Sequence, residues 1–195
     1  MRLPLRLSCR NFLLLPLVLL VALVTGCAGP AANYAPSVDN VETLKKAANI
    51  PLKVGTVNVA PGLVGAAAVS LRGSTMVSPV GAHFGDYVAA AVKQELELAK
   101  LYNPASATEI SGTLLKNNID AGGISTNAGQ IEARFVVTNG GQVRFDKIKA
   151  IEHSWESSFA GGVAIPLARN NYPVMVQKLV GSLLGDPDFV KAIRN

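Results

Sequence analysis

The sequence contains little cysteine and little histidine, and this scarcity limits the chemistry that it can support. Its two cysteines are Cys9 and Cys27, and its two histidines are His83 and His153. Cys9 falls in an N-terminal segment that we expect to be removed, so the mature chain would have neither an internal disulfide nor a cysteine-based metal site. His83 and Asp86 share one face of a predicted helix, but a metal site needs three or four ligands, so we expect no bound metal.

Nucleophilic catalysis finds equally little support. A serine or cysteine nucleophile needs a base and a third group that orients the base. His153 is followed by Ser154, but neighbours on a strand point to opposite faces. Neither histidine lies near a Gly-x-Ser-x-Gly turn. We therefore assign no catalytic residue.

Signals for phosphate binding and glycan cleavage are weak. The glycine-rich residues 62–65 lack the lysine of a phosphate loop, and Gly122-Gly123 precedes a predicted strand, so both are interpreted as turns. The carboxylates of the predicted sheet region have spacings that single out no catalytic pair; they are Asp120, Glu132, Asp146, Glu152 and Glu156. We expect no cofactor, and a hydrolase acting on a cell-wall or lipid substrate is kept as the alternative function.

The N-terminus has the layout of a secretory signal. The basic residues Arg2, Arg6 and Arg10 precede an uncharged apolar stretch at residues 12–24, which is shorter than the roughly 20 residues of a membrane-spanning helix. We predict that residues 1–26 are removed. Loss of the three arginines leaves 15 basic and 13 acidic residues, a net charge of +2. This small excess argues against a nucleic-acid partner.

The segment from Val24 to Cys27 resembles the lipobox of bacterial lipoproteins, with small residues directly before a cysteine. The resemblance implies that Cys27 is lipidated and that the protein is anchored to the membrane through acyl chains. Ala28 stands where an aspartate would retain such a lipoprotein in the inner membrane, which implies the outer membrane and a periplasm-facing domain. Residues 28–40 are rich in Ala, Pro, Asn and Ser, so we interpret residues 27–50 as a tether, with a short helical turn as the alternative for residues 41–48.

Residues 51–195 are predicted to form one α+β domain, with a mostly antiparallel sheet of about five strands and two main helices packed on one face. Apolar residues alternate over residues 52–59, and a second strand is expected within residues 67–77. Ser78-Pro79 is a helix-start signal before a buried stripe that runs from Phe84 to Ala99, with Glu95 assigned to the polar side.

Three further strands and a second helix complete the predicted domain. The strands lie near residues 110–114, 131–137 and 143–155, separated by a glycine-rich turn at residues 120–130 and by Asn139-Gly140-Gly141. We expect those three residues to form the hairpin loop, which pairs Phe135 with Phe145 and Arg134 with Asp146, and we expect a bulge near Lys147. The second helix should begin at Asn171, end at a left-handed Gly185 and be followed by a short turn from Asp186.

Two groups of residues are candidates for partner binding. Arg134, Arg144, Lys147 and Lys149 lie on neighbouring strands, although interleaved acidic residues favour a mixed, solvated face. Trp155 and Phe159, close to Gly161-Gly162, form either a partner-binding loop or the end of the core.

The lipobox at Cys27 and the order of helix, long strands and helix resemble the small outer-membrane lipoproteins of the YajG type. The resemblance covers the layout of most of the mature chain. It implies a non-enzymatic accessory role in protein binding or envelope assembly, with another envelope protein as partner. It transfers no functional residue other than Cys27. The oligomeric state and a lipid-carrying role are left open.

Overall fold

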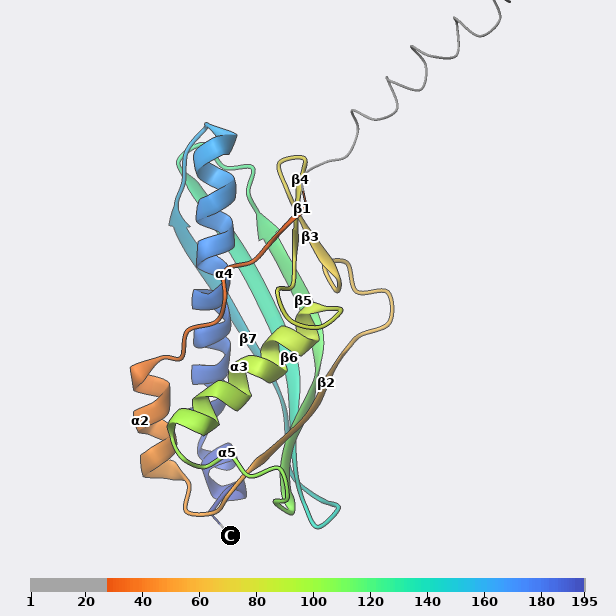
Figure 1. The fold of residues 1–195 in the computed structure, drawn as a ribbon, viewed down its shortest axis with the longest axis vertical. Helices are drawn as coiled ribbons and strands as arrows, with labels where there is room; N and C mark the ends of the chain where they lie inside the picture. The colour runs from red at the N-terminus through yellow and green to blue at the C-terminus, as the bar shows by residue number, and fades with distance from the viewer. Residues whose placement is uncertain (1–27, 195) are drawn as a thin grey trace, which may run out of the picture.

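The computed structural model describes residues 28–194, so the predicted signal and Cys27 lie outside the described residues. Its larger sheet has four strands in the order β2 (Lys53–Val59), β5 (Thr108–Asp120), β6 (Thr126–Asn139) and β7 (Gln142–Glu156). The β5–β6 and β6–β7 pairs are antiparallel, whereas β2 and β5 run parallel. The three long strands form a twisted ribbon along the length of the molecule (Figure 1).

A smaller sheet joins β1 (Ala28–Pro30), β4 (Ser74–Val77) and β3 (Ala68–Leu71) in that order. β1 is parallel to β4, and β3 and β4 form an antiparallel hairpin. The α+β class is confirmed, but the prediction of one mostly antiparallel sheet of about five strands is wrong. Both sheets are mixed and together contain seven strands in the described part of the chain. The region 67–77 contains two of these strands instead of one.

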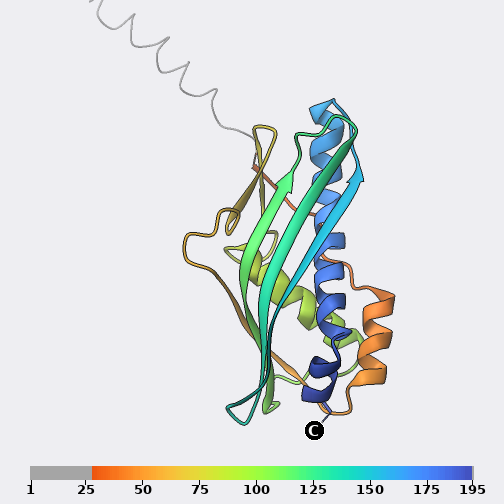
Figure 2. The ribbon, with the colours of Figure 1, turned by 180° about the vertical axis from the view of Figure 1, so that it is seen from behind.

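The helices α3 (Phe84–Leu98) and α4 (Gly161–Leu184) pack on one face of the larger sheet, and α2 (Val38–Ala47) and α5 (Pro187–Ala192) lie beside them (Figure 1). Tyr87 of α3 and Tyr172 of α4 meet edge to face, with ring centroids 5.2 Å apart, inside the core. Seen from behind, the opposite face of β5, β6 and β7 is covered by no helix of residues 28–194 (Figure 2). The larger sheet therefore has one buried face and one open face.

The interpretation of residues 27–50 as a tether is wrong for the described residues. β1 begins at Ala28, and Tyr34, Asn40 and Leu44 are buried. Residues of this segment form hydrogen bonds to Glu95 of α3. The Glu95 side chain is fully buried, so its assignment to the polar side of the helix is wrong.

One oxygen of the Glu95 carboxylate accepts three hydrogen bonds from this N-terminal segment. The donors are the Tyr34 hydroxyl at 2.6 Å, the Ser37 backbone N–H at 2.9 Å and the Asn40 side-chain amide at 3.2 Å. Burial and the adjacent Glu95 carboxylate raise the pKa of Tyr34, so its hydroxyl stays a donor. A buried carboxylate must be compensated by donors, so these contacts join the N-terminal segment to the domain.

Helix α4 begins ten positions before the predicted start at Asn171, and it contains both Pro166 and Pro173. A proline inside a helix leaves the carbonyl four residues earlier without its usual donor. For Pro173 that carbonyl belongs to Arg169, and it accepts the backbone N–H of Ala32 at 3.2 Å. The N-terminal segment thus satisfies the group that the proline frees. The helix ends at Gly185 in a right-handed conformation, so the predicted left-handed cap is wrong.

Helix α3 begins at Phe84, later than the Ser78-Pro79 signal predicted. His83 caps it, because its ring Nδ1 accepts the backbone N–H of Asp86 and the Asp86 carboxylate accepts the backbone N–H of His83. The two residues that resembled a partial metal site therefore form a capping box.

The β6–β7 hairpin has a two-residue loop, Gly140-Gly141, and not the three-residue loop that we predicted. Asn139 pairs with Gln142 at the turn. Arg144 then forms a bulge, so the next pairs are shifted by one residue and Val137 lies opposite Phe145. Both glycines have positive φ, as a tight turn between twisted strands requires. The predicted bulge near Lys147 is thus found at Arg144, and β6 itself begins inside the region predicted as a glycine-rich turn.

Replacing Tyr34→Phe tests whether the N-terminal segment belongs to the domain. Loss of one hydrogen bond to a buried carboxylate should lower the free energy of unfolding by about 2 kcal/mol. Urea denaturation measures this change. Val38→Ala, in the same segment but 78% exposed, is the control and should change it by less than about 0.5 kcal/mol. Equal, small effects of the two substitutions would show that the hydrogen bond from Tyr34 to Glu95 does not hold the N-terminal segment to the domain.

Candidate functional site

The open side of the larger sheet, together with the free edge of β7, is the candidate functional surface. We call this side the outer face. β7 is the last strand of its sheet, and β6 is its one neighbour among the described strands. Side chains alternate between the two faces along β6 and β7, and along β5 on either side of a register irregularity between Leu114 and Lys116. The following side chains point outward: Ser111, Thr113, Asn118, Asp120, Gln130, Glu132, Arg134, Val136, Asp146, Ile148, Ala150, Glu152 and Ser154.

Arg134 lies in the middle of the outer face, on β6. Its guanidinium forms a two-pronged ion pair with Asp146 of β7. The hydrogen bonds from Arg134 lower the pKa of Asp146, and the Asp146 carboxylate raises the pKa of Arg134. The register places Val136 opposite Asp146, so the pair is diagonal across the strands. Arg144 is separate from it, at the bulge near the hairpin. The structure therefore does not gather the four predicted cations into one patch.

Three of the five candidate carboxylates come together on the outer face. Asp120, Glu132 and Glu152 surround two shallow hollows of about 260 and 250 Å³, whose floor includes Gln130. Asp146 is neutralised by Arg134, and Glu156 lies at the end of β7. The result is a polar surface of mixed charge over which Ile148 and Val136 provide apolar area.

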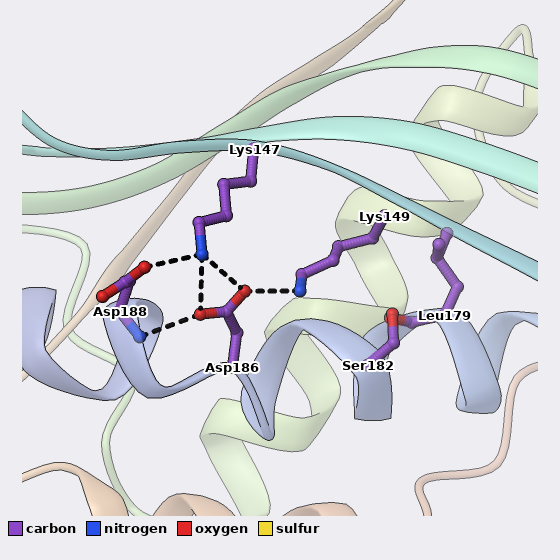
Figure 3. A network of polar contacts seen from close by, with 6 residues as sticks. All are labelled: Lys147, Lys149, Leu179, Ser182, Asp186 and Asp188. Atoms are coloured by element: carbon purple, nitrogen blue, oxygen red, sulfur yellow. Dashed lines mark hydrogen bonds and ion pairs between the residues drawn. The ribbon is translucent and has the colours of Figure 1, made fainter.

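Lys147 and Lys149 point to the other side of β7, toward the helices. The Lys149 amine contacts the Asp186 carboxylate at 2.5 Å, and the Lys147 amine lies 3.2 Å from Asp186 and 2.6 Å from Asp188 (Figure 3). Asp186 is buried and also accepts the Asp188 backbone N–H, as the cap of α5. The hydrogen bond from Lys149 holds the pKa of Asp186 well below its usual range. These lysines anchor α5 to the sheet and are not free for an anionic ligand.

A groove of about 360 Å³ lies beside this network, lined by Arg144, Phe145, Lys191 and the two ends of the ion pairs at Asp146 and Asp188. Its lining contains both positive and negative side chains, including Lys147. The groove therefore favours neither an anion nor a cation.

His153 also points inward, toward α4. Its Nε2 lies 3.1 Å from the Asn171 side-chain oxygen, and its Nδ1 lies 2.9 Å from the Lys178 amine. Partial burial lowers the pKa of His153, with a further contribution from Lys178. A neutral ring satisfies both contacts, by donating to Asn171 and accepting from Lys178. Ser154 points to the opposite face, as expected for strand neighbours.

The two aromatic candidates, Trp155 and Phe159, have different environments: the first is buried and the second is exposed. Trp155 is buried beside His153, with ring centroids 5.6 Å apart, which confirms that it closes the end of the core. Its indole N–H has no hydrogen-bond partner, and neither has the side chain of Asn127 opposite it on β6. Phe159 is exposed in the loop before α4.

Several important residues carried signals that the sequence analysis did not use. Glu95 falls on the stripe of α3 that contains Val88 and Val92, three residues after Val92. Lys147 and Lys149 alternate in phase with the apolar Phe145. In each case a charged residue occupies a position that the apolar periodicity assigns to the core. That signal would have identified Glu95 and the two lysines as structurally important.

Within residues 28–194, no helix is long and apolar enough to cross a bilayer, and no three His, Cys, Asp or Glu side chains gather closely enough to hold a metal ion.

Comparison with known proteins shows similarity at the level of fold alone. No family model matches the chain, and no curated protein matches it. The crystal structure of XCC0632 from Xanthomonas campestris, assigned to the family model DUF330, is 14% identical, covers 85% of this chain and 96% of its own, and has a TM-score of 0.54. The hypothetical protein CT253 from Chlamydia trachomatis is 8% identical and covers 74% of this chain and 99% of its own, with a TM-score of 0.47.

Replacing Asp186→Asn tests the lysine–aspartate network. The asparagine retains a cap for α5 but loses the charge that Lys149 and Lys147 compensate, so the free energy of unfolding at pH 7 should fall by about 2 kcal/mol. Because the pKa of Asp186 is lowered in the folded state, the wild-type advantage exists above the ordinary carboxyl pKa of about 4 and shrinks as the pH falls below it.

Urea denaturation of both proteins between pH 3 and pH 7 measures this difference. Asp188→Asn is the matched control, because Asp188 is exposed and pairs with Lys147 alone. A stability difference for Asp186→Asn that does not change with pH would contradict the ionic role of the network.

Proposed function

We propose that the chain is an accessory lipoprotein of the bacterial envelope, anchored through Cys27 to the outer membrane and facing the periplasm. In this proposal the protein is not an enzyme. It binds another envelope protein through the outer face and the free edge of β7. The observation that carries the proposal is a 15-residue edge strand next to a sheet face that none of the described helices covers.

The two halves of the free edge of β7 differ in how well they are protected against pairing with a strand of another protein. Strand edges present unpaired N–H and C=O groups, and charged side chains or bulges protect them from pairing. The first half of β7 has both protections, the bulge at Arg144 and the amines of Lys147 and Lys149. The stretch from Ala150 to Ser154 has no bulge and no lysine, and its one charged side chain is Glu152, so a partner strand would add there.

The outer face supplies the side-chain contacts for such a partner. Ile148 and Val136 lie among small and polar residues and beside the compensated Arg134–Asp146 pair. Apolar area within a rim of hydrogen-bonding groups is the usual composition of a protein interface. The Ile148 side chain is exposed on this face, where its burial by a partner would stabilise a complex.

Site-specific crosslinking in cells tests the binding surface. A photoreactive amino acid placed at Ile148 or Ala150 should crosslink one dominant envelope protein, which mass spectrometry identifies. The same amino acid at Leu98, which is exposed at the end of α3 on the helical side, is the control and should not capture it. Capture from Leu98 but not from Ile148 would place the partner on the wrong side and refute the proposed surface.

The anchor is tested separately by Cys27→Ala. Without the thiol the chain cannot be acylated, so the protein should leave the membrane fraction while its urea denaturation midpoint stays unchanged. Mass spectrometry of the wild-type N-terminal peptide should show acyl chains on Cys27. Retention of the variant in the membrane fraction at the size of the processed protein would contradict the lipid anchor.

A further inference from the structure

Three of the large apolar side chains that the fold leaves exposed lie together at one end of the molecule. Ile124 lies in the β5–β6 turn and is 72% exposed, Phe159 lies in the β7–α4 loop and is 79% exposed, and Val163 lies in the first turn of α4 and is 49% exposed. The two loops touch, because the Ser157 N–H donates to the Ser125 carbonyl at 2.8 Å. We call these three side chains the apolar tip.

The two chain segments that contain the apolar tip have no charged side chains. Residues 121–131 and residues 157–168 contain no Asp, Glu, Lys or Arg. The polar side chains between them are serine, threonine, asparagine and glutamine. An apolar cluster whose own loops carry no charged side chain has a lower desolvation penalty when it enters an apolar phase than a charged surface has.

Arg72 fixes the shape of the apolar tip. From the β3–β4 turn, its guanidinium donates to the carbonyl of Phe159 at 2.7 Å and also to the carbonyls of Ala121 and Gly123. Its backbone has a positive φ of 49°, which few non-glycine residues adopt. One side chain thus holds both loops, and the carbonyl oxygens of these loops accept hydrogen bonds from its guanidinium.

The chain enters the fold at this same end. Ala28 pairs with Thr75 of β4, which lies three positions after Arg72. The Arg169 side chain of α4 donates to Ser74 and Thr75 and lies against Gly29. In Figure 1 the start of β1, the β3–β4 hairpin, the β5–β6 turn and the start of α4 share one end of the molecule, opposite the β6–β7 turn.

We propose that the apolar tip is a membrane-contact site, which enters the lipid surface to which Cys27 is anchored. The inference rests on the proposed function for the anchor, since Cys27 directly precedes β1 and leaves no tether between the acyl chains and the fold. An anchor at that position holds this end of the domain at the bilayer. The apolar tip is then the part of the surface that meets the acyl region, where burial of apolar side chains is favourable.

This contact fixes the orientation of the domain. The 14 residues of β6 span about 45 Å, from the membrane end to the Gly140-Gly141 turn. The long strands stand on the membrane, and the outer face looks sideways, where a partner protein reaches it.

Fluorescence quenching on the intact lipoprotein tests the membrane contact. Phe159→Cys and Ile124→Cys each add a thiol to a protein whose Cys27 is acylated, and an environment-sensitive fluorophore is attached there. The proteins are reconstituted into vesicles of phosphatidylethanolamine and phosphatidylglycerol with nitroxide-labelled acyl chains. Fluorescence of both labels should fall at least twofold. Val143→Cys, exposed beside the opposite turn, is the matched control and should be unaffected.

The outcomes separate the two proposals. Labels at the apolar tip that are quenched no more than the label at Val143, in a protein that floats with vesicles, overturn the membrane contact and leave the anchor intact. A wild-type protein whose Cys27 takes up the fluorophore overturns the anchor. In that case the labels at residues 124, 159 and 143 are compared in the Cys27→Ser background. Quenching of the first two labels on vesicle addition supports the membrane contact of the apolar tip, and no quenching overturns it.

Discussion

The side chain of Glu95 has no exposed surface, and one of its oxygens accepts three hydrogen bonds while the other is buried without a partner among the described residues, so the burial of this polar group depends on those three donors. Its three donors come from residues 34, 37 and 40, so the first segment of the described chain is bound into the interior. Asn40 extends this contact to α4 by donating to the Gln177 carbonyl. The position of α2, the pairing of β1 and the completion of the Pro173 gap by Ala32 all depend on the same segment staying in place.

Periodicity predicted the elements that have one apolar side. The strand at residues 52–59, the stripe of α3 and the buried residues of α4 from Tyr172 to Leu183 were found in this way. The first turns of α4 were missed, because Gly161-Gly162 and Pro166 are local breakers that packing overrides. β1 is a three-residue strand, too short to show any period, and the composition of its neighbourhood favoured a tether.

The candidate surface was predicted in parts. Cross-strand pattern indicated the Arg134–Asp146 contact, and the actual register, shifted by the Arg144 bulge, still lets it form on the diagonal. Trp155 closes the core, one of the two alternatives that its position allowed. The apolar tip had no sequence signal, because Ile124 and Phe159 lie far apart in the chain and meet only through the fold. Lipidation of Cys27, the membrane and the partner protein stay predictions that the described residues do not reach.

The parallel pairing of β1 with β4 has a mechanical consequence for an anchored protein. Hydrogen bonds between strands run across the strand direction, so a force along the chain from its membrane end loads the three pairs from Ala28 to Pro30 together, in shear. Beyond them, the same force meets the Ala32–Arg169 bond and the Glu95 cluster in turn. When a bound partner is dragged sideways, the force between anchor and sheet would therefore be resisted by these three groups of contacts in turn. The domain would then move with its anchor as one rigid body.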